Sequence, residues 1–139
     1  MATIEDKIKQ FRAEVGNRTL TPEQQELFRV FCRTGGKPHR FVVTDTEGRS
    51  INLYVSSDKT SDGTQHILLR HFGTKRGRVT AGEILNMLDV VRKGDRVAGD
   101  ATHYAYKLTR KSNGVLYTVG VKINKNTHRI KSFYSNRGY

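Results

Sequence analysis

The chain has 139 residues, of which 35% are hydrophobic, so it has enough apolar material for one domain with a modest core. No apolar run could cross a bilayer or act as a signal peptide, and the single cysteine, Cys32, excludes an internal disulfide and a cysteine-based zinc site. The net charge of +12 attracts a polyanion, and residues 101–139 hold eight Lys or Arg and no carboxylate. We therefore expect a cytoplasmic protein that binds nucleic acid and not a membrane.

The first quarter of the chain is helical in pattern and nearly neutral in charge. Residues 3–15 have apolar side chains at helical spacing, and Thr21 and Pro22 are a typical N-cap and first residue for a second helix over 22–33. Residues 1–34 carry six basic and five acidic side chains, whereas residues 35–139 carry nineteen and eight. We predict a helical N-terminal extension, 1–34, and a basic α+β domain, 35–139, packed as one compact unit.

The middle of the chain alternates between strand and helix patterns. Residues 40–55 are predicted to form a β-hairpin, since two apolar runs flank the turn sequence Asp45-Thr46-Glu47-Gly48. A short helix is expected from about Gly63 to Phe72. Thr80 and Glu83 form a capping box, which predicts another helix that continues to Lys93.

The last third is predicted to be an antiparallel meander. Apolar and polar residues alternate over 104–109 and 115–123, around an Asn113-Gly114 pair typical of a two-residue turn. Such a turn would place Thr109 opposite Thr118. A third strand is expected over 128–134. Its alternation is less regular, and Ser132 can be assigned to one face only if the strand contains a bulge.

The segment from His66 to His71 holds the densest group of residues suited to acid–base chemistry. His66 and Arg70 are four residues apart and share a helix face, and His71 can join them if the helix ends near Arg70. Spacing alone fits surface histidines as well as a site. The other histidines, His39, His103 and His128, are weaker candidates.

Metal-independent cleavage of RNA requires a base for the 2′-hydroxyl, an acid for the leaving oxygen and groups that bind phosphate. Histidine titrates near neutral pH, arginine binds phosphate with paired hydrogen bonds, and hydroxyls can donate to phosphoryl oxygens. The carboxylates of the basic part are scattered, and no nucleotide-binding or hydrolase motif occurs, so we expect neither a metal nor another cofactor. The candidates for binding the substrate are Arg70, Lys107, Thr109, Arg110, Lys122 and Lys131.

The order of these motifs resembles the phage-type members of the barnase–EndoU–colicin–RelE nuclease superfamily. The resemblance covers roughly residues 40–137 and includes His66-Ile-x-x-Arg-His71, Val79-Thr80-x-x-Glu83-Ile84 and Ile130-Lys-Ser132-Phe-Tyr134. It implies an α+β fold in which helices pack on a four-stranded antiparallel sheet. It also implies a ribonuclease toxin that cleaves RNA, commonly tRNA, to a 2′,3′-cyclic phosphate, and a cognate immunity protein or antitoxin.

The resemblance and the strand pattern together define a catalytic hypothesis. By position, His66 and His71 match the helix histidines of the family, and Ser132 and Tyr134 match its final-strand hydroxyl motif; Thr118 is added because of its expected strand face. The alternative is a basic RNA- or DNA-binding accessory protein without catalysis. Only the enzyme requires His66 or His71 to meet the hydroxyls of the last strand, so this geometry separates the two interpretations.

Overall fold

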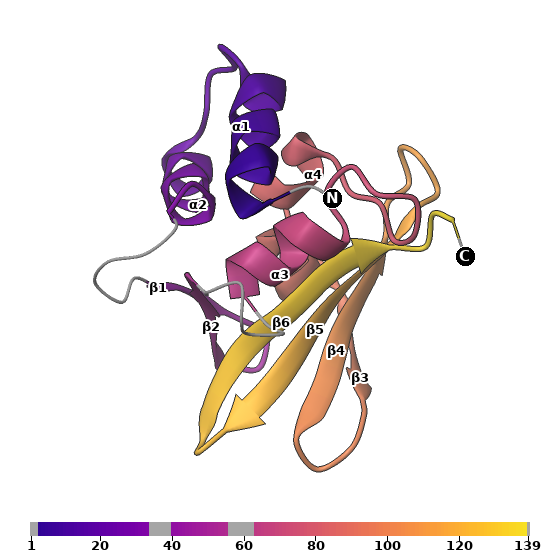
Figure 1. Cartoon of the computed structure of the whole chain (residues 1–139). Helices are drawn as coiled ribbons and strands as arrows, with labels where there is room; N and C mark the ends of the chain where they lie inside the picture. Colours follow the sequence, from indigo (N-terminus) through magenta and orange to yellow (C-terminus); the bar gives the residue numbers. More distant parts are fainter. Residues whose placement is uncertain (1–2, 34–39, 56–62, 139) are drawn as a thin grey trace.

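The computed structural model describes residues 3–33, 40–55 and 63–138. Within these ranges the chain is an α+β protein whose helices pack against a mixed β-sheet (Figure 1). The helices are α1 Ile4–Val15, α2 Pro22–Phe31, α3 Gly63–Arg70, α4 Ala81–Leu85 and α5 Leu88–Lys93. The strands are β1 Arg40–Thr44, β2 Ser50–Tyr54, β3 Asp95–Ala98, β4 His103–Thr109, β5 Leu116–Asn124 and β6 Thr127–Ser135.

The sheet is larger than the four-stranded sheet that the resemblance implied. In the described part of the chain it has six strands in the order β1-β2-β6-β5-β4-β3. All neighbours are antiparallel except β2 and β6, which run parallel over the short pairing of Ile51 with His128 and Asn52 with Arg129. Three strands join the meander of β4, β5 and β6: β1 and β2 of the 40–55 hairpin, which are added through β6, and β3, which lies at the opposite edge and was not predicted.

The N-terminal helices were correctly predicted, and both begin with a capping box. Thr3 and Asp6 cap α1, and Thr21 and Gln24 cap α2. The single helix expected over 80–93 is wrong, because the chain leaves the helical conformation at Asn86, between α4 and α5. The side chain of Asn86 explains this break: its amide donates to the Gly82 carbonyl at 2.9 Å and accepts from Gln24 at 3.0 Å.

The hairpin between β4 and β5 forms, but its predicted register is wrong. Thr109 pairs with Leu116, and Lys107 pairs with Thr118. The Asn113-Gly114 pair is not a two-residue turn, since Arg110 and Val115 still bond to each other and residues 111–114 make the connection. The shift of two residues leaves the side chains of β4 and β5 on their predicted faces, because strand side chains alternate with a period of two.

A β-bulge in β6 settles the face of its polar residues. Gly120 pairs with Ser132, whereas Val121 pairs with Ile130, so Lys131 is the additional residue. Ile130 and Phe133 can therefore both point into the core, where each is about 1% exposed. Ser132 and Tyr134 consequently share the opposite face of the sheet, here called the outer face.

The buried apolar side chains of both predicted parts form one core. Phe11 of α1 contacts Phe28 and Phe31 of α2, and it also contacts Phe72, which follows α3, with ring centroids 5.8 Å apart. In Figure 1, α1, α2 and α4 lie together above the sheet, and α3 runs beside β6. The N-terminal helices thus pack directly against the segment that carries the two helix histidines.

Candidate functional site

The end of α3 brings the two helix histidines together. The last residue of α3 is Arg70, and the backbone amides of His71 and Phe72 both donate to the Ile67 carbonyl. The ring centroids of His66 and His71 lie 6.1 Å apart. The ring of His71 also contacts Tyr134 of β6, at 5.3 Å between centroids. A helix that ends at Arg70 was the condition under which the sequence allowed these side chains to share one site.

The loop that follows α3 fixes the ring of His71. Its Nδ1 lies 3.3 Å from the carbonyl oxygen of Arg76. Because a carbonyl can only accept, we assign the proton of the neutral ring to Nδ1, which leaves Nε2 as an acceptor. Burial lowers the pKa of His71 below its ordinary value, as does the charge of Arg70, while the Arg76 carbonyl acts in the opposite direction. Both the burial and the Arg70 charge therefore favour the neutral form of the ring, which can accept a proton at Nε2.

Helix α1 supports the same segment from the core side. The side chain of Lys7 is buried, and its Nζ donates to the carbonyl oxygen of Phe72 at 2.6 Å. Its ammonium also lies 5.9 Å from the centroid of the Phe72 ring. Burial lowers the pKa of Lys7. The residue next to His71 is thus held at its carbonyl by Lys7 and at its ring by Phe11.

The outer face presents hydroxyl groups beside these histidines. Thr118 pairs with Tyr134 across β5 and β6, and Ser132 pairs with Gly120 one step further along the ladder. Thr118 and Ser132 are mostly buried, at 4% and 8% exposed, and Tyr134 is half-buried. Lys107 lies on β4 in the same row as Thr118 and Tyr134. The predicted catalytic residues therefore converge on one end of the outer face.

Tyr134 separates two hollows on this face. One hollow, of about 320 Å³, is lined by Lys107, Leu116, Thr118, Tyr134, Ser135 and Asn136. The other, of about 300 Å³, lies between the β3–β4 connection and the bulge of β6, and it includes His103, Lys131, Ser132 and Tyr134. Small-molecule sites usually occupy roughly 300–1,000 Å³, so each hollow has room for a group of modest size.

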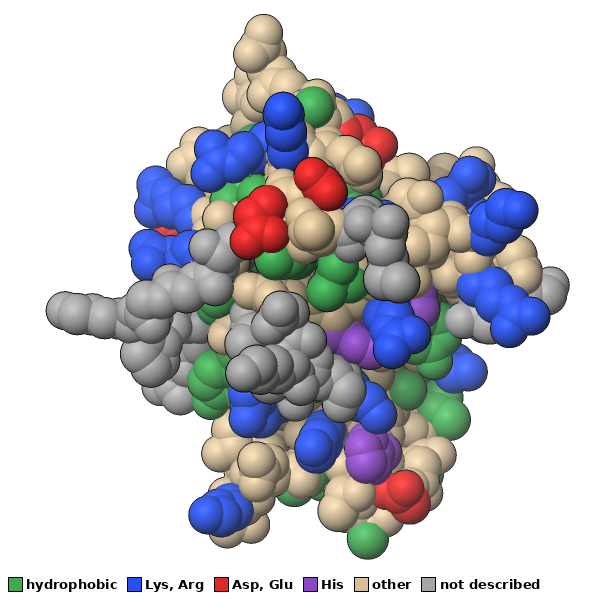
Figure 2. Space-filling view, in the orientation of Figure 1, with side chains coloured by type: hydrophobic (Ala, Val, Ile, Leu, Met, Phe, Trp, Pro, Cys, Tyr) green, Lys and Arg blue, Asp and Glu red, His purple; other side chains and the backbone are tan. Residues whose placement is uncertain are grey.

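Most of the predicted substrate-binding residues lie near this end of the outer face or along it. Arg70 is exposed at the end of α3, and Lys131 forms the bulge. Thr109 and Lys122 lie on the outer face, where Thr109 pairs with Leu116 and Lys122 pairs with His103. Figure 2 shows histidine and several Lys and Arg side chains on the face turned to the viewer. A polyanion that follows this face would thus meet positive charge along its path.

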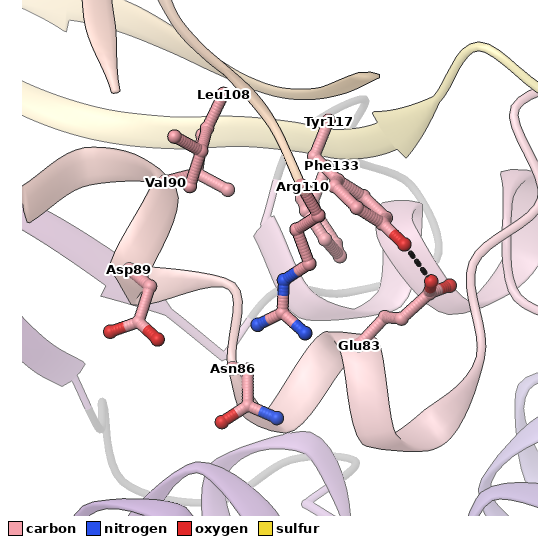
Figure 3. Close-up of a pocket in the computed structure, with 8 residues that line it drawn as sticks. All are labelled: Glu83, Asn86, Asp89, Val90, Leu108, Arg110, Tyr117 and Phe133. Atoms are coloured by element: carbon pink, nitrogen blue, oxygen red, sulfur yellow. Dashed lines mark hydrogen bonds between the residues drawn. The ribbon is translucent and has the colours of Figure 1, made fainter. Parts of the chain in front are cut away.

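Arg110 lies on the other side of the sheet and does not join this group. Its guanidinium is 5.9 Å from the ring of Tyr117, a core-facing residue. Figure 3 shows its side chain pointing toward the junction of α4 and α5, where Asn86 and Asp89 line the same small pocket. The strand alternation explains the difference, because Arg110 follows Thr109 and so takes the opposite face.

The structure also gives two histidines surroundings that the sequence did not indicate. His103 Nδ1 is held by Asp100 at 3.2 Å and by the Thr102 hydroxyl at 2.9 Å, at the rim of the smaller hollow. The Asp-x-Thr-His sequence at 100–103 is the signal that could have found this group, since Asp often closes such turns. His128 is half-buried on the core side and bonds to the hydroxyl of Tyr104. His39 lies outside the described residues.

The chain matches no family model, no curated protein and no solved structure. Among the described residues, no three His, Cys, Asp or Glu side chains are grouped as metal ligands. None of the described helices is both long and apolar enough to cross a membrane.

Proposed function

We propose that the protein is a metal-independent endoribonuclease whose site lies where α3 meets the outer face of β6. One observation carries the proposal: His71 contacts His66 on one side and Tyr134 on the other, and Tyr134 shares its strand face with Thr118 and Ser132. Proton-transfer groups are thus adjacent to hydroxyl donors and within a basic surface. A protein that only binds RNA has no need of a half-buried imidazole whose pKa is lowered, placed beside a second histidine and a tyrosine.

In this mechanism His71 is the general base. Its Nε2 accepts the proton of a ribose 2′-hydroxyl, while the Nδ1 proton remains bonded to Arg76. The 2′-oxygen then bonds to phosphorus, and the bond from phosphorus to the 5′-oxygen breaks. The products are a 2′,3′-cyclic phosphate and a 5′-hydroxyl, which forms when the leaving oxygen takes up a proton. We assign this second proton transfer to protonated His66, which lies beside His71.

The remaining groups stabilise the charge that develops on the phosphoryl oxygens. Tyr134 and Thr118 offer hydroxyl donors in one row of the sheet, with the Lys107 ammonium on the next strand. Ser132 offers a further hydroxyl one step along β6. Arg70 is exposed at the end of α3, where a guanidinium can bind phosphate with two parallel hydrogen bonds. The proton transfers and the charge stabilisation are thus all supplied by side chains.

The resemblance to the barnase–EndoU–colicin–RelE superfamily extends the proposal to biology. We propose a toxin of bacterial or phage origin that cleaves RNA, with tRNA as the first substrate to test. An immunity protein or antitoxin would then be its natural partner. The strongly basic surface fits an acidic inhibitor as well as RNA, since both are polyanions at this face.

The alternative is a non-catalytic RNA- or DNA-binding accessory protein. The spread of Lys107, Lys122 and Lys131 along the outer face favours it, because a basic track needs no catalyst. The two functions differ in one measurable respect. An accessory protein would retain RNA in a binding assay and leave it intact, whereas an endoribonuclease would produce discrete fragments.

The deciding experiment incubates total RNA with the protein in the presence of EDTA and compares the wild type with His71→Ala. We expect discrete fragments from the wild type and a loss of roughly 10²–10⁴-fold in rate for the variant, as is usual when a general base is removed. His128→Gln is the matched control, since His128 is a half-buried histidine on the core side. Thermal melting of each protein shows whether a loss of activity reflects unfolding.

The pH dependence provides a second readout for the same assignment. The pKa of His71 lies below its ordinary value of 6.5, and a general base must be unprotonated. The cleavage rate should therefore fall on the acid side, below pH 6.5, where His71 becomes protonated, and fall again on the alkaline side, where His66 loses the proton that it donates to the leaving oxygen. Wild-type protein that binds RNA but never cleaves it would overturn the proposal, as would full activity of folded His71→Ala.

A further inference from the structure

The hollow between the β3–β4 connection and β6 adjoins the proposed site of cleavage and shares Ser132 and Tyr134 with it. It has a volume of about 300 Å³, and Tyr134, which His71 contacts, forms one of its walls. The bulge residue Lys131 and the mostly buried Ser132 line it on β6, and His103 lies at its far end. The hollow therefore begins at Tyr134, which contacts the proposed base His71, and it extends away from His71 toward His103.

Small residues create this hollow. Gly120 and Ala105 pair with each other across β5 and β4, and both line the hollow on the outer face. The φ angle of Gly120 is not positive, so other residues can adopt its backbone conformation. A Cβ atom built on Gly120 would come within 3.0 Å of the Ser132 hydroxyl. The missing side chain thus leaves room beside Ser132 that even a methyl group would begin to fill.

His103 is too far from His71 to assist at the same phosphate. It lies four residues along β4 from Lys107, which shares a row with Tyr134, and four strand residues span about 13 Å. A proton donor must reach the reacting oxygen within about 3 Å, directly or through one water. Asp100 and Thr102 hold Nδ1 of His103, which leaves Nε2 as the nitrogen available to a ligand. The ring is thus better placed to contact an adjacent group of the substrate.

We propose that this hollow binds one nucleobase next to the scissile phosphate, so that the substrate is single-stranded RNA at this point. An aromatic wall at Tyr134 suits stacking of a base, and the Ser132 hydroxyl and His103 can bond to its edge. In a duplex the base edge is paired and the base is stacked on its neighbours, so a paired base cannot enter. That the ligand is RNA rests on the proposed function. The volume of the hollow and the residues that line it are independent of that function.

The test measures binding without cleavage. Fluorescein-labelled 2′-O-methyl oligonucleotides have no free 2′-hydroxyl, so they can be bound but not cut. We would titrate six-residue single strands of each base, and a duplex of the same length, with wild type and Gly120→Val. We expect Gly120→Val to weaken single-strand binding by roughly tenfold, in keeping with the contribution of one stacked base, and to leave duplex binding unchanged. Ser50→Val, on the exposed start of β2, is the matched control.

Each outcome bears on one of the two proposals. Equal single-strand affinity of folded Gly120→Val and wild type would overturn the base subsite, even if the wild type cleaves RNA. Wild type that favours single strands and loses this preference in Gly120→Val would support the subsite, even if it never cleaves RNA. Equal wild-type affinity for single strands and duplex, or no binding of either, would also overturn it. If Gly120→Val does not fold, Ala105→Leu fills the same hollow from β4 and is judged by the same comparison.

Discussion

Glu83 provides the strongest prediction about stability, because it joins α4 to β5 and to the C-terminal segment. Its carboxylate accepts from Arg137 Nη1 at 2.7 Å and Nη2 at 2.8 Å, and from the hydroxyl of Tyr117. It also accepts from the backbone amide of Thr80 at 2.9 Å, as part of the capping box of α4. The side chain is only 12% exposed. Replacement by Gln keeps the shape and the capping box and removes the charge.

The contribution of Glu83 to the free energy of unfolding follows from the pKa of its carboxyl group. Burial alone would raise the pKa of Glu83, but hydrogen bonds from Arg137 and Tyr117 lower it from 4.5 to about 2. A tenfold change in proton affinity corresponds to about 1.4 kcal/mol, so the folded state gains about 3 kcal/mol from this group. Because the folded pKa is the lower one, this stability is complete above about pH 5. It is lost as the pH falls through the folded pKa near 2.

Urea denaturation at pH 7, 5 and 3 tests this reasoning. We expect Glu83→Gln to lower the free energy of unfolding at pH 7 by about 3 kcal/mol, and the difference from wild type to shrink markedly at pH 3. Glu26→Gln is the matched control: Glu26 pairs with Arg29 on the surface, where both side chains are well exposed, and such pairs contribute about 0–1 kcal/mol. A difference for Glu83→Gln that is equally large at pH 7 and pH 3 would refute the charge-based account.

Two further predictions concern the candidate site and its surface. Lys7→Met removes the donor that holds the Phe72 carbonyl beside His71, so we expect the cleavage rate to fall roughly tenfold or more while KM changes little. An unchanged pH profile and rate in steady-state assays would show that Lys7 only fills space. Lys107→Ala combined with Lys122→Ala removes two cations from the outer face, so the plot of log Kd against log salt for single-stranded RNA should become less steep, by about 1.4 in slope. An equal slope in fluorescence titrations would place the phosphate path elsewhere, for example on Lys75, Arg76 and Arg78.

The sequence was most informative where structure depends on neighbouring residues. The N-terminal helices begin at their predicted caps, and the 40–55 hairpin turns at Asp45–Gly48, where Asp45 accepts from the amides of Glu47 and Arg49. These bonds join residues a few positions apart, so residue types alone predict them. The strand β3 has no such mark, because all four of its residues are exposed and its sequence, Asp-Arg-Val-Ala, shows no apolar face. It exists because β4 offers an unpaired edge.

The errors in register and in helix length have the same kind of cause. The Asn113-Gly114 pair favours a two-residue turn. The amide of Arg110 instead donates to the carbonyl of Val115, so four residues, 111–114, connect the strands. Asn113 instead donates to the Tyr117 hydroxyl and accepts from the Val115 amide. Asn86 interrupts the expected helix because Gln24, 62 positions away in the chain, bonds to its side chain. Such contacts are set by the packing of distant segments and leave no periodic pattern in the local sequence.

The candidate site depends on two irregularities of the backbone that the sequence analysis raised as conditions but could not predict. The first is the end of α3 at Arg70, without which a regular helix would turn His71 about 140° away from His66. The second is the bulge at Lys131. Without it, a one-residue change would place Ser132 in the core and Phe133 on the outer face. Both departures from regularity bring polar groups to one place at the expense of backbone pairing, as is common at functional sites.

The N-terminal helices are best understood as part of the same arrangement. Their near-neutral composition indicated a separate extension, yet Lys7 and Phe11 of α1 both contact Phe72, the residue after His71. Burying a lysine lowers its pKa and costs solvation energy, and a methionine of similar length would avoid that cost. The bond from Lys7 to the Phe72 carbonyl offsets part of this cost, and it fixes the backbone from which His71 projects. We therefore interpret α1 and α2 as the support that holds the end of α3 against β6, and so holds the imidazole of His71 against Tyr134.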